Sequence, residues 1–167
     1  MKYKKISNNI KGKSNIQAGE TNDCSVRAFA TALDVTYDAA HKFVKDTYDR
    51  VNRKGCEKMV KVTSKLKGKV LNIEGTEFDI NPLNKKFITN KYKLHGEVIE
   101  RKKTVKSFIK DFSKGIYLVM VSGHVFTVKN GIMIDNAGEE WRPTRKVEDV
   151  FEINLKNILE QMELNFG

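Results

Sequence analysis

Apolar residues recur at helical spacing at two places near the N-terminus. The first stripe follows Asn22 and Asp23, two residue types that favour the N-cap position, and predicts a helix that extends to about Leu33. The second predicts a helix from Tyr37 to about Asn52. The expected inner residues of the two helices are Val26, Phe29, Ala30 and Leu33, and then Tyr37, Ala40, Phe43, Val44, Tyr48 and Val51.

A third helical stripe and a strand follow in the second half of the chain. Thr104 is a good N-cap residue, and Gly115 is placed to stop the helix that begins there. The apolar stripe between them consists of Val105, Phe108, Ile109 and Phe112. Residues 116–121 are then almost continuously β-branched or apolar, which is typical of a buried strand.

Two further strands are expected after a break at Ser122-Gly123. Residues 124–129 and 132–135 flank Asn130-Gly131, a dipeptide that is the strongest short-range signal for a two-residue hairpin turn. Because helices come first and an antiparallel sheet follows, the order of elements indicates an α+β fold and not an alternating βαβ arrangement.

The segment 56–96 has the least regular pattern. It mixes short β-type runs at 69–73 and 87–89 with turn residues, and no helix or strand stands out. The chain has no internal repeat and no low-complexity linker, so we expect a single domain over residues 1–167. Within it, residues 1–20 are a candidate flexible basic arm and residues 56–96 a candidate insertion.

The charge of the chain narrows the choice of partners. Lys and Arg number 31 against 21 Asp and Glu, which gives a formal net charge of +10. Residues 136–167 contain four basic and seven acidic residues, so the positive surplus lies in the first 135 residues. Such a surface can attract nucleic acid, anionic membranes or acidic proteins, but a lysine-rich solvated surface without a partner has the same composition and is the simpler interpretation. No RNP, zinc-finger or helix-turn-helix signature is present, so nucleic acid is possible but not favoured.

Several classes of protein are disfavoured by composition. No apolar run approaches the ~18 residues of a membrane span, and the basic N-terminus lacks the apolar segment of a secretory signal. Two cysteines are too few for a disulfide framework, so we expect a cytoplasmic protein with no membrane partner. With three histidines and no Cys or His at metal-ligand spacing, we expect no metal site and no cofactor.

Cys24 is a candidate nucleophile because of its position. It follows an Asn-Asp pair in the first turn of a predicted helix. The unpaired N–H groups and the helix dipole favour an anion there, so the reactive thiolate would be stabilised. A buried, unreactive cysteine has the same appearance in a sequence, so position alone does not decide its role.

His124 and Asp135 are brought together by the expected hairpin. If the turn has two residues, Lys129 pairs with Ile132, and Asp135 lies diagonal to His124 on the same face of the sheet. A carboxylate at that separation can orient an imidazole that acts as general base. A bulge or a three-residue turn would place Asn136 across from His124 instead. Asp135 is therefore the first choice, and Asn136 is the reserve.

The remaining candidates carry weaker signals. Cys56 lies in a basic stretch and is expected to be an ordinary thiol, and His41 lies within the second predicted helix. His95 precedes a glycine in a basic loop. Trp141 could line a substrate groove, although packing under the C-terminal loop is the simpler interpretation.

Three segments of the chain resemble papain-like cysteine peptidases. The first is Thr-Asn-Asp-Cys-Ser-Val-Arg-Ala at 21–28. It resembles the segment that begins the nucleophile's helix in small phage-encoded members related to bacteriocin-processing peptidases. Residues 117–135, in which Gly-His precedes a hairpin that ends in Asp, resemble the second half of those proteins. Arg145-Lys146-Val147 followed by Phe151 is similar to their basic and aromatic ending. The resemblance covers residues 21–52 and 104–151.

The resemblance implies a papain-like α+β fold with acyl transfer to Cys24. The nucleophile would lie at a helix N-terminus packed on the sheet that carries the other two residues, with His124 as base and Asp135 as orienting residue. The oxyanion would be bound by the Cys24 N–H and a side-chain amide. Family members often have Gln about six residues before the Cys, but position 18 is Ala here, so Gln17 and Asn22 are the candidates.

The sequence leaves three functional classes open. The first is a cysteine peptidase or isopeptidase that acts on a protein or peptide. If the chain is phage-encoded, an acidic host protein is a candidate substrate. The second is a non-catalytic papain-like binding module that holds nucleic acid or an acidic protein through its basic surface, for which Lys102, Lys103 and Lys106 are the test positions. The third is a thiol deamidase or acyltransferase with the same three residues.

Overall fold

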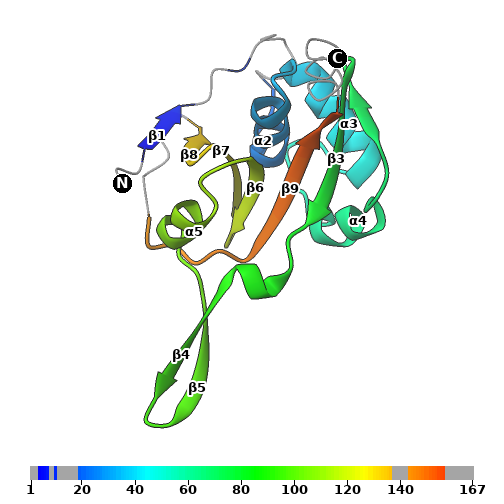
Figure 1. Ribbon diagram of the computed structural model, residues 1–167. Helices are drawn as coiled ribbons and strands as arrows, with labels where there is room; N and C mark the ends of the chain where they lie inside the picture. The colour runs from blue at the N-terminus through cyan, green and yellow to red at the C-terminus, as the bar shows by residue number, and fades with distance from the viewer. Residues whose placement is uncertain (1–3, 8–9, 11–18, 137–142, 157–167) are drawn as a thin grey trace.

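The chain folds into helices packed on a largely antiparallel sheet, which confirms the expected α+β class. The structure is a computed structural model that describes residues 4–7, 10, 19–136 and 143–156 (Figure 1). In chain order, its elements are β1 (Lys4–Ser7), α2 (Cys24–Leu33), α3 (Tyr37–Tyr48), α4 (Met59–Lys65), β2 (Leu71–Ile73), β3 (Thr76–Pro82), the 3₁₀ turn η1 (Lys85–Phe87), β4 (Thr89–Leu94), β5 (Glu97–Lys102), α5 (Val105–Asp111), β6 (Ile116–Val121), β7 (His124–Lys129), β8 (Ile132–Asp135) and β9 (Asp149–Leu155).

Seven of these strands form one sheet in the order β1-β8-β7-β6-β9-β3-β2. Neighbouring strands are antiparallel except for β1, which runs parallel to β8. Strands β4 and β5 pair only with each other and form a ribbon that projects from the body of the molecule (Figure 1). The chain returns at its end to place β9 between β6 and β3.

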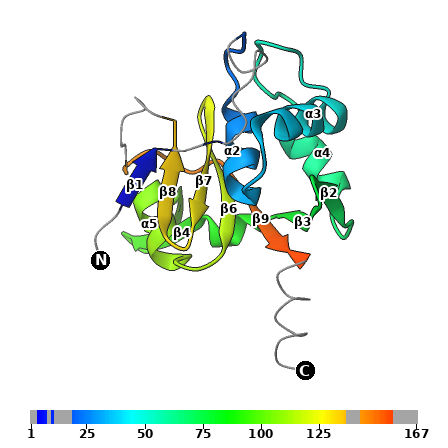
Figure 2. The ribbon, with the colours of Figure 1, turned by 90° about the horizontal axis from the view of Figure 1, so that it is seen from above.

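Hydrophobic clusters cover both faces of the sheet, as the alternation of side chains along β6 shows. Leu118 belongs to the cluster formed with α2, α3 and α4, whereas Tyr117 and Val119 belong to the cluster formed with α5. Successive residues of a strand point to opposite faces, so the two clusters lie on opposite sides of the sheet. Figure 2 shows α2, α3 and α4 grouped together, apart from α5.

The three predicted helices are present, but two of them end early. Helix α5 ends at Asp111, with Phe112 as its C-cap, before the expected stop at Gly115. The second helix ends at Tyr48 and not near Asn52, because Asp49 takes a left-handed conformation with φ 56° and ends the helical hydrogen bonding. Val51 was expected on the inner face, but it lies beyond this end and is 59% exposed. The other predicted inner residues of the two N-terminal helices are buried, except for Phe43, which is partly buried.

Side-chain capping follows the sequence at two helices and departs from it at the third. The Thr36 and Thr104 hydroxyls accept N–H bonds from Ala39 and Ser107, as expected of N-cap residues. Asp23 occupies the N-cap position of α2 but makes no side-chain cap bond. Its carboxylate instead accepts hydrogen bonds from Arg27 and Tyr37.

The hairpin between β7 and β8 has the predicted two-residue turn. Asn130 and Gly131 have φ values of 47° and 80°, the left-handed pair that this turn requires. The register pairs Lys129 with Ile132, as expected. The turn is also tied to Gly115, whose N–H donates to Asn130 Oδ1 and whose carbonyl accepts from the Asn130 N–H.

Two regions without a clear pattern in the sequence join the main sheet. Residues 4–7 were part of the candidate flexible arm, but they form β1, which pairs with β8. Without β1, strand β8 would be an edge strand with unpaired backbone N–H and C=O groups, and β1 pairs with these groups. In the 56–96 segment, β2 and β3 extend the sheet beyond β9, and β3 buries Phe78 and Ile80 completely. The β-type run expected at 87–89 is instead the end of η1 and the start of β4.

None of the helices in the part of the chain that the structure describes combines the length and the apolar character needed to cross a bilayer.

Candidate active site

Cys24 is the first residue of α2, as the sequence predicted. Its side chain is partly exposed. The helix packs against β6 and β7, and its position is fixed by a buried hydrogen bond of 2.7 Å from Thr127 Oγ1 to the carbonyl of Ala28. The thiol therefore lies at the positive end of a helix that is anchored in the core.

His124 and Asp135 are in direct contact. Nε2 of His124 lies 2.9 Å from both carboxylate oxygens of Asp135, which is 3% exposed. The backbone N–H of Asn136, the reserve candidate, donates to Asp135 Oδ1 at 2.7 Å. The diagonal placement that the hairpin register predicted is thus confirmed, and Asp135 is the residue that contacts the imidazole.

His124 also forms a side-chain hydrogen bond with Cys24, and both of its partners raise its pKa. Burial lowers the pKa of His124, but side-chain hydrogen bonds to Asp135 and Cys24 and the negative charge of both partners outweigh burial and raise it to about 10. Because Nε2 is engaged by Asp135, Nδ1 is the ring nitrogen left for the thiol. The imidazole is therefore protonated at neutral pH, in contact with a sulfur and a carboxylate.

Cys24 and His124 line a common cleft of about 180 Å³. Its other lining residues are Ser25, Gly55, Cys56, Glu57, Met59, Met120, Val121, Gly123 and Val125. One wall comes from the loop before α4, and the other comes from the β6–β7 turn, where Gly123 has φ 73° and no atom lies within 4 Å of the position that a Cβ would take. The cleft is mainly apolar, with Glu57 as the acidic group on its wall.

A buried ionic cluster, which no pattern in the sequence predicts, holds the segment that leads to Cys24. Glu20 accepts hydrogen bonds from His41 Nε2 at 3.0 Å, from Arg50 Nη1 and from the backbone N–H of Arg53 at 2.7 Å. The side chains of Glu20 and Arg50 are 3% and 1% exposed. Burial raises the pKa of Glu20, but its hydrogen bonds to Arg50, Arg53 and His41 outweigh burial, so the pKa lies below its ordinary value.

Further bonds from the same loop hold the neighbouring backbone. Arg53 Nε donates to the carbonyl of Gly19, and Arg50 Nη2 donates to that of Thr21. The only signal in the sequence was an arginine just beyond a helix end and an isolated glutamate before the nucleophile. Neither has a pattern that predicts contact over 30 residues.

Of the two oxyanion candidates, only Asn22 lies within the described residues. Gln17 lies outside the described residues. The Asn22 side chain donates its amide to the carbonyl of Arg53 at 3.2 Å, and the residue has φ 52°. One donor of this amide is therefore used to hold the loop that precedes Cys56.

The weaker candidates occupy different places. Burial raises the pKa of the Cys56 thiol to about 11, and Cys24 adds to this through its charge. His95 lies in the β4–β5 turn with φ 51°. Trp141 lies outside the described residues. Among the described residues, no group of three or more His, Cys, Asp or Glu side chains is arranged to hold a metal ion.

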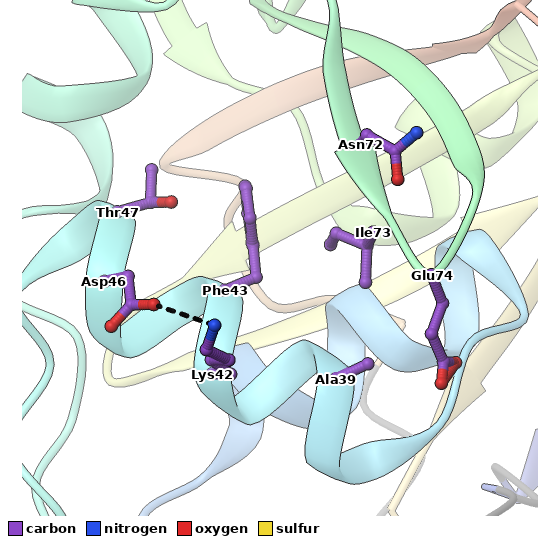
Figure 3. Close-up of a pocket in the computed structure, with 8 residues that line it drawn as sticks. All are labelled: Ala39, Lys42, Phe43, Asp46, Thr47, Asn72, Ile73 and Glu74. Carbon is purple, nitrogen blue, oxygen red and sulfur yellow. Dashed lines mark ion pairs between the residues drawn. The ribbon is translucent and has the colours of Figure 1, made fainter.

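A larger hollow lies elsewhere and has none of this chemistry. Figure 3 shows a groove of about 370 Å³ between α3 and the β2–β3 hairpin, with Phe43 and Ile73 between the two elements. Its charged groups have partners: Lys42 lies 3.9 Å from Asp46, and the Glu74 carboxylate accepts two bonds from Thr36 at the start of α3. The smaller cleft with Cys24 is therefore the candidate site.

Comparison of the chain with protein-family models, with curated proteins and with solved structures finds no match. The geometry of the cleft is therefore the basis for any functional assignment.

Proposed function

We propose that the protein is a papain-like cysteine peptidase or isopeptidase that cleaves an amide bond through an acyl-thioenzyme at Cys24. The observation that supports this best is the contact of His124 with both Cys24 and Asp135, which come from α2, β7 and β8. A thiol at a helix N-terminus, an imidazole and a buried carboxylate are the parts that nucleophilic catalysis by cysteine requires.

The steps follow from the positions of the three groups. Cys24 Sγ attacks the carbonyl carbon of the substrate, and the imidazolium of His124 gives its proton to the leaving amine, which leaves a thioester. Water then attacks the thioester while His124 takes its proton, and the acid is released as the thiolate forms again. Asp135 holds Nε2, which leaves Nδ1 as the ring nitrogen that exchanges the proton in these steps. The backbone N–H of Cys24 supplies one donor to the oxyanion.

The charge of the whole chain bears on the substrate. The net charge of +10 favours an acidic protein or peptide, such as a host protein in the cytoplasm if the chain is phage-encoded. The mechanism requires no metal or cofactor, because the thiolate and the imidazolium supply both the nucleophile and the acid. A deamidase or an acyltransferase would use the same thioester and differ only in the leaving group or the acceptor.

The first test measures the rate at which iodoacetamide alkylates Cys24, from about pH 4 to about pH 10, with peptide mass mapping. Cys56 serves as a control within the same molecule, since its raised pKa makes it a slow thiol. We expect rapid labelling of Cys24 well below pH ~8.5, and a loss of about tenfold or more in His124→Ala. Labelling of Cys24 at the rate of an ordinary thiol, unchanged by His124→Ala, would contradict the proposal.

The exposed lysines support a second candidate, a non-catalytic binding module. Lys58, Lys61 and Lys65 lie exposed on and beside α4. Of the lysines chosen from sequence, Lys103 is unsuitable, because it is buried and its Nζ lies 2.6 Å from Asp111. A binding module should tolerate Cys24→Ser and lose salt-sensitive binding when the three α4 lysines become Glu, whereas a peptidase should lose its activity in Cys24→Ser with the fold intact.

A further inference from the structure

The only two cysteines of the chain lie on the same cleft. Cys24 and Cys56 both line it, both are partly exposed, and both pack against the same hydrophobic cluster. They are 32 positions apart in the sequence, so their meeting is a product of the fold. The peptidase mechanism uses Cys24 and assigns nothing to Cys56.

Hydrogen bonds hold the two cysteine-bearing segments side by side. Asn22 Nδ2 and Thr21 Oγ1 both donate to the carbonyl of Arg53, at 3.2 and 3.4 Å. Cys24 follows Asn22 by two residues, and Cys56 follows Arg53 by three. A further bond joins the Arg53 N–H to Glu20, so the segment before the nucleophile is attached to the loop before α4 at several points.

The backbone around Cys56 leaves room for the two sulfurs to approach. Residues 49–58 form no helix or strand, and most of them are exposed. Gly55, directly before Cys56, has no atom within 4 Å of the position of a Cβ, so the backbone there is not closely packed. A disulfide needs Cα atoms about 4.4–6.8 Å apart, and the exposed backbone at Gly55, between the Arg53 anchor and Cys56, is the part of the loop that would adjust to that distance.

The two thiols also differ in the way that a redox pair requires. His124 lies beside Cys24 at the start of α2, and the proposed mechanism uses Cys24 as the thiolate, which is the form that peroxides attack. Cys56 has a raised pKa and so remains a thiol near neutral pH, which protects it from direct oxidation. Oxidation therefore begins at Cys24, and Cys56 is the nearby group that can react with the product.

We propose that Cys24 and Cys56 form a reversible oxidation site for hydroperoxides. The Cys24 thiolate attacks the peroxide oxygen and breaks the O–O bond, which gives the sulfenic acid and, from hydrogen peroxide, hydroxide. The Cys56 sulfur then attacks Cys24 Sγ, the S–O bond breaks, and the Cys56 proton leaves with the hydroxyl group as water. With hydrogen peroxide, two thiols and one peroxide thus give one disulfide and two molecules of water, and a thiol reductant restores both cysteines.

The site rests on the proposed function only in the reactivity of Cys24, and it predicts a protective effect. Without a neighbouring thiol, a sulfenic acid proceeds to the sulfinic acid, which thiol reductants do not reverse. The disulfide blocks the nucleophile but preserves it. Cys56 would therefore protect the candidate enzyme from permanent inactivation.

The experiment treats the full chain with hydrogen peroxide and follows intact mass and disulfide-mapped peptides. The wild-type protein should lose about 2 Da as a monomer, yield the peptide pair that joins Cys24 to Cys56, and regain most of its Cys24 alkylation after dithiothreitol. Cys56→Ser should instead gain about 32 Da at Cys24 and regain little. Cys24→Ser, the matched control, should show no change of mass at the same peroxide dose.

The two proposals fail in different ways. Absence of the joined peptides, or equal recovery of wild type and Cys56→Ser, would overturn the oxidation site. Neither result touches the alkylation profile of Cys24 measured in wild type without oxidant. A disulfide between two molecules, visible as a dimer mass, would also overturn the assignment.

Discussion

Replacing Asp135 by Asn tests the charge of the carboxylate while keeping its shape. The Asn side chain can still accept a hydrogen bond from His124 Nε2 and one from the Asn136 N–H. What it removes is the negative charge that holds the proton on the imidazole. The variant therefore separates orientation of the ring from stabilisation of its charged form.

The size of the expected effect follows from the pKa of His124, which rises from 6.5 to about 10. Each pH unit corresponds to ~1.4 kcal/mol, so the partners together favour the imidazolium by a few kcal/mol against the cost of burial. Asp135 is the largest of the contributions that raise this pKa. In Asp135→Asn we expect the pKa of His124 to fall by about two pH units or more, since burial then acts with less opposition.

Proton–carbon NMR of the imidazole rings measures this directly, with His124→Ala used to assign the signals. Alkylation of Cys24 at pH ~7 should fall about tenfold or more in the same variant, because the thiolate loses its imidazolium partner. Asp46→Asn, on the exposed side of α3, is the matched control and should change neither value. A His124 signal that titrates near 6.5 in wild type, or one that is unmoved by Asp135→Asn, would refute the reasoning.

The same proton also governs stability. The native state holds a proton on His124 that the unfolded chain releases above its pKa of about 6.5, so this contribution is complete below 6.5 and is lost as the pH rises through about 10. The free energy of unfolding should therefore decrease over this interval in wild type, and it should decrease less in Asp135→Asn. Urea unfolding at several pH values measures the slope.

Two further substitutions address the supports of the nucleophile's helix, with urea unfolding as the measurement. Glu20→Gln leaves Arg50 buried without its countercharge and should cost ~3–5 kcal/mol, whereas Asp46→Asn, which breaks an exposed pair, should cost below ~0.5 kcal/mol; equal losses would argue against the buried cluster. Tyr37→Phe removes the buried bond of 2.7 Å to Asp23 and should cost ~1–3 kcal/mol, and no loss at all would mean that this bond does not contribute.

The parts of the site that were predictable are those fixed by local chemistry. The Asn130-Gly131 turn sets the register of β7 and β8, and the register alone places Asp135 beside His124. Likewise, a helix stripe that begins at Cys24 is enough to locate the thiol at a helix N-terminus. In each case, the residues that decide the geometry lie within about a dozen positions of one another.

The rest depended on contacts that local patterns do not encode. The cluster of Glu20, His41 and Arg50 forms because the segment before α2, helix α3 and the loop after α3 meet. In the sequence, none of these three residues can be told from an ordinary polar surface residue. Cys56 likewise reaches the cleft through a loop that has no periodicity. Strand β3 was not predicted, although Phe78 and Ile80 alternate in it and Glu74-Gly75 turns it back onto β2; its longer pairing, with β9, lies about 70 residues later in the sequence.

The position of β9 has a consequence for the order of events during synthesis. This last strand separates β3 from β6, so the strands that precede it can form two partial sheets but cannot be joined until residue 155 has left the ribosome. At a synthesis rate of ~5–20 residues per second, β3 is complete several seconds before β9 is made and can pair with it. A nascent or truncated chain that lacks β9 therefore exposes two open strand edges in the middle of the unfinished sheet, and these are the surfaces that a chaperone would need to cover.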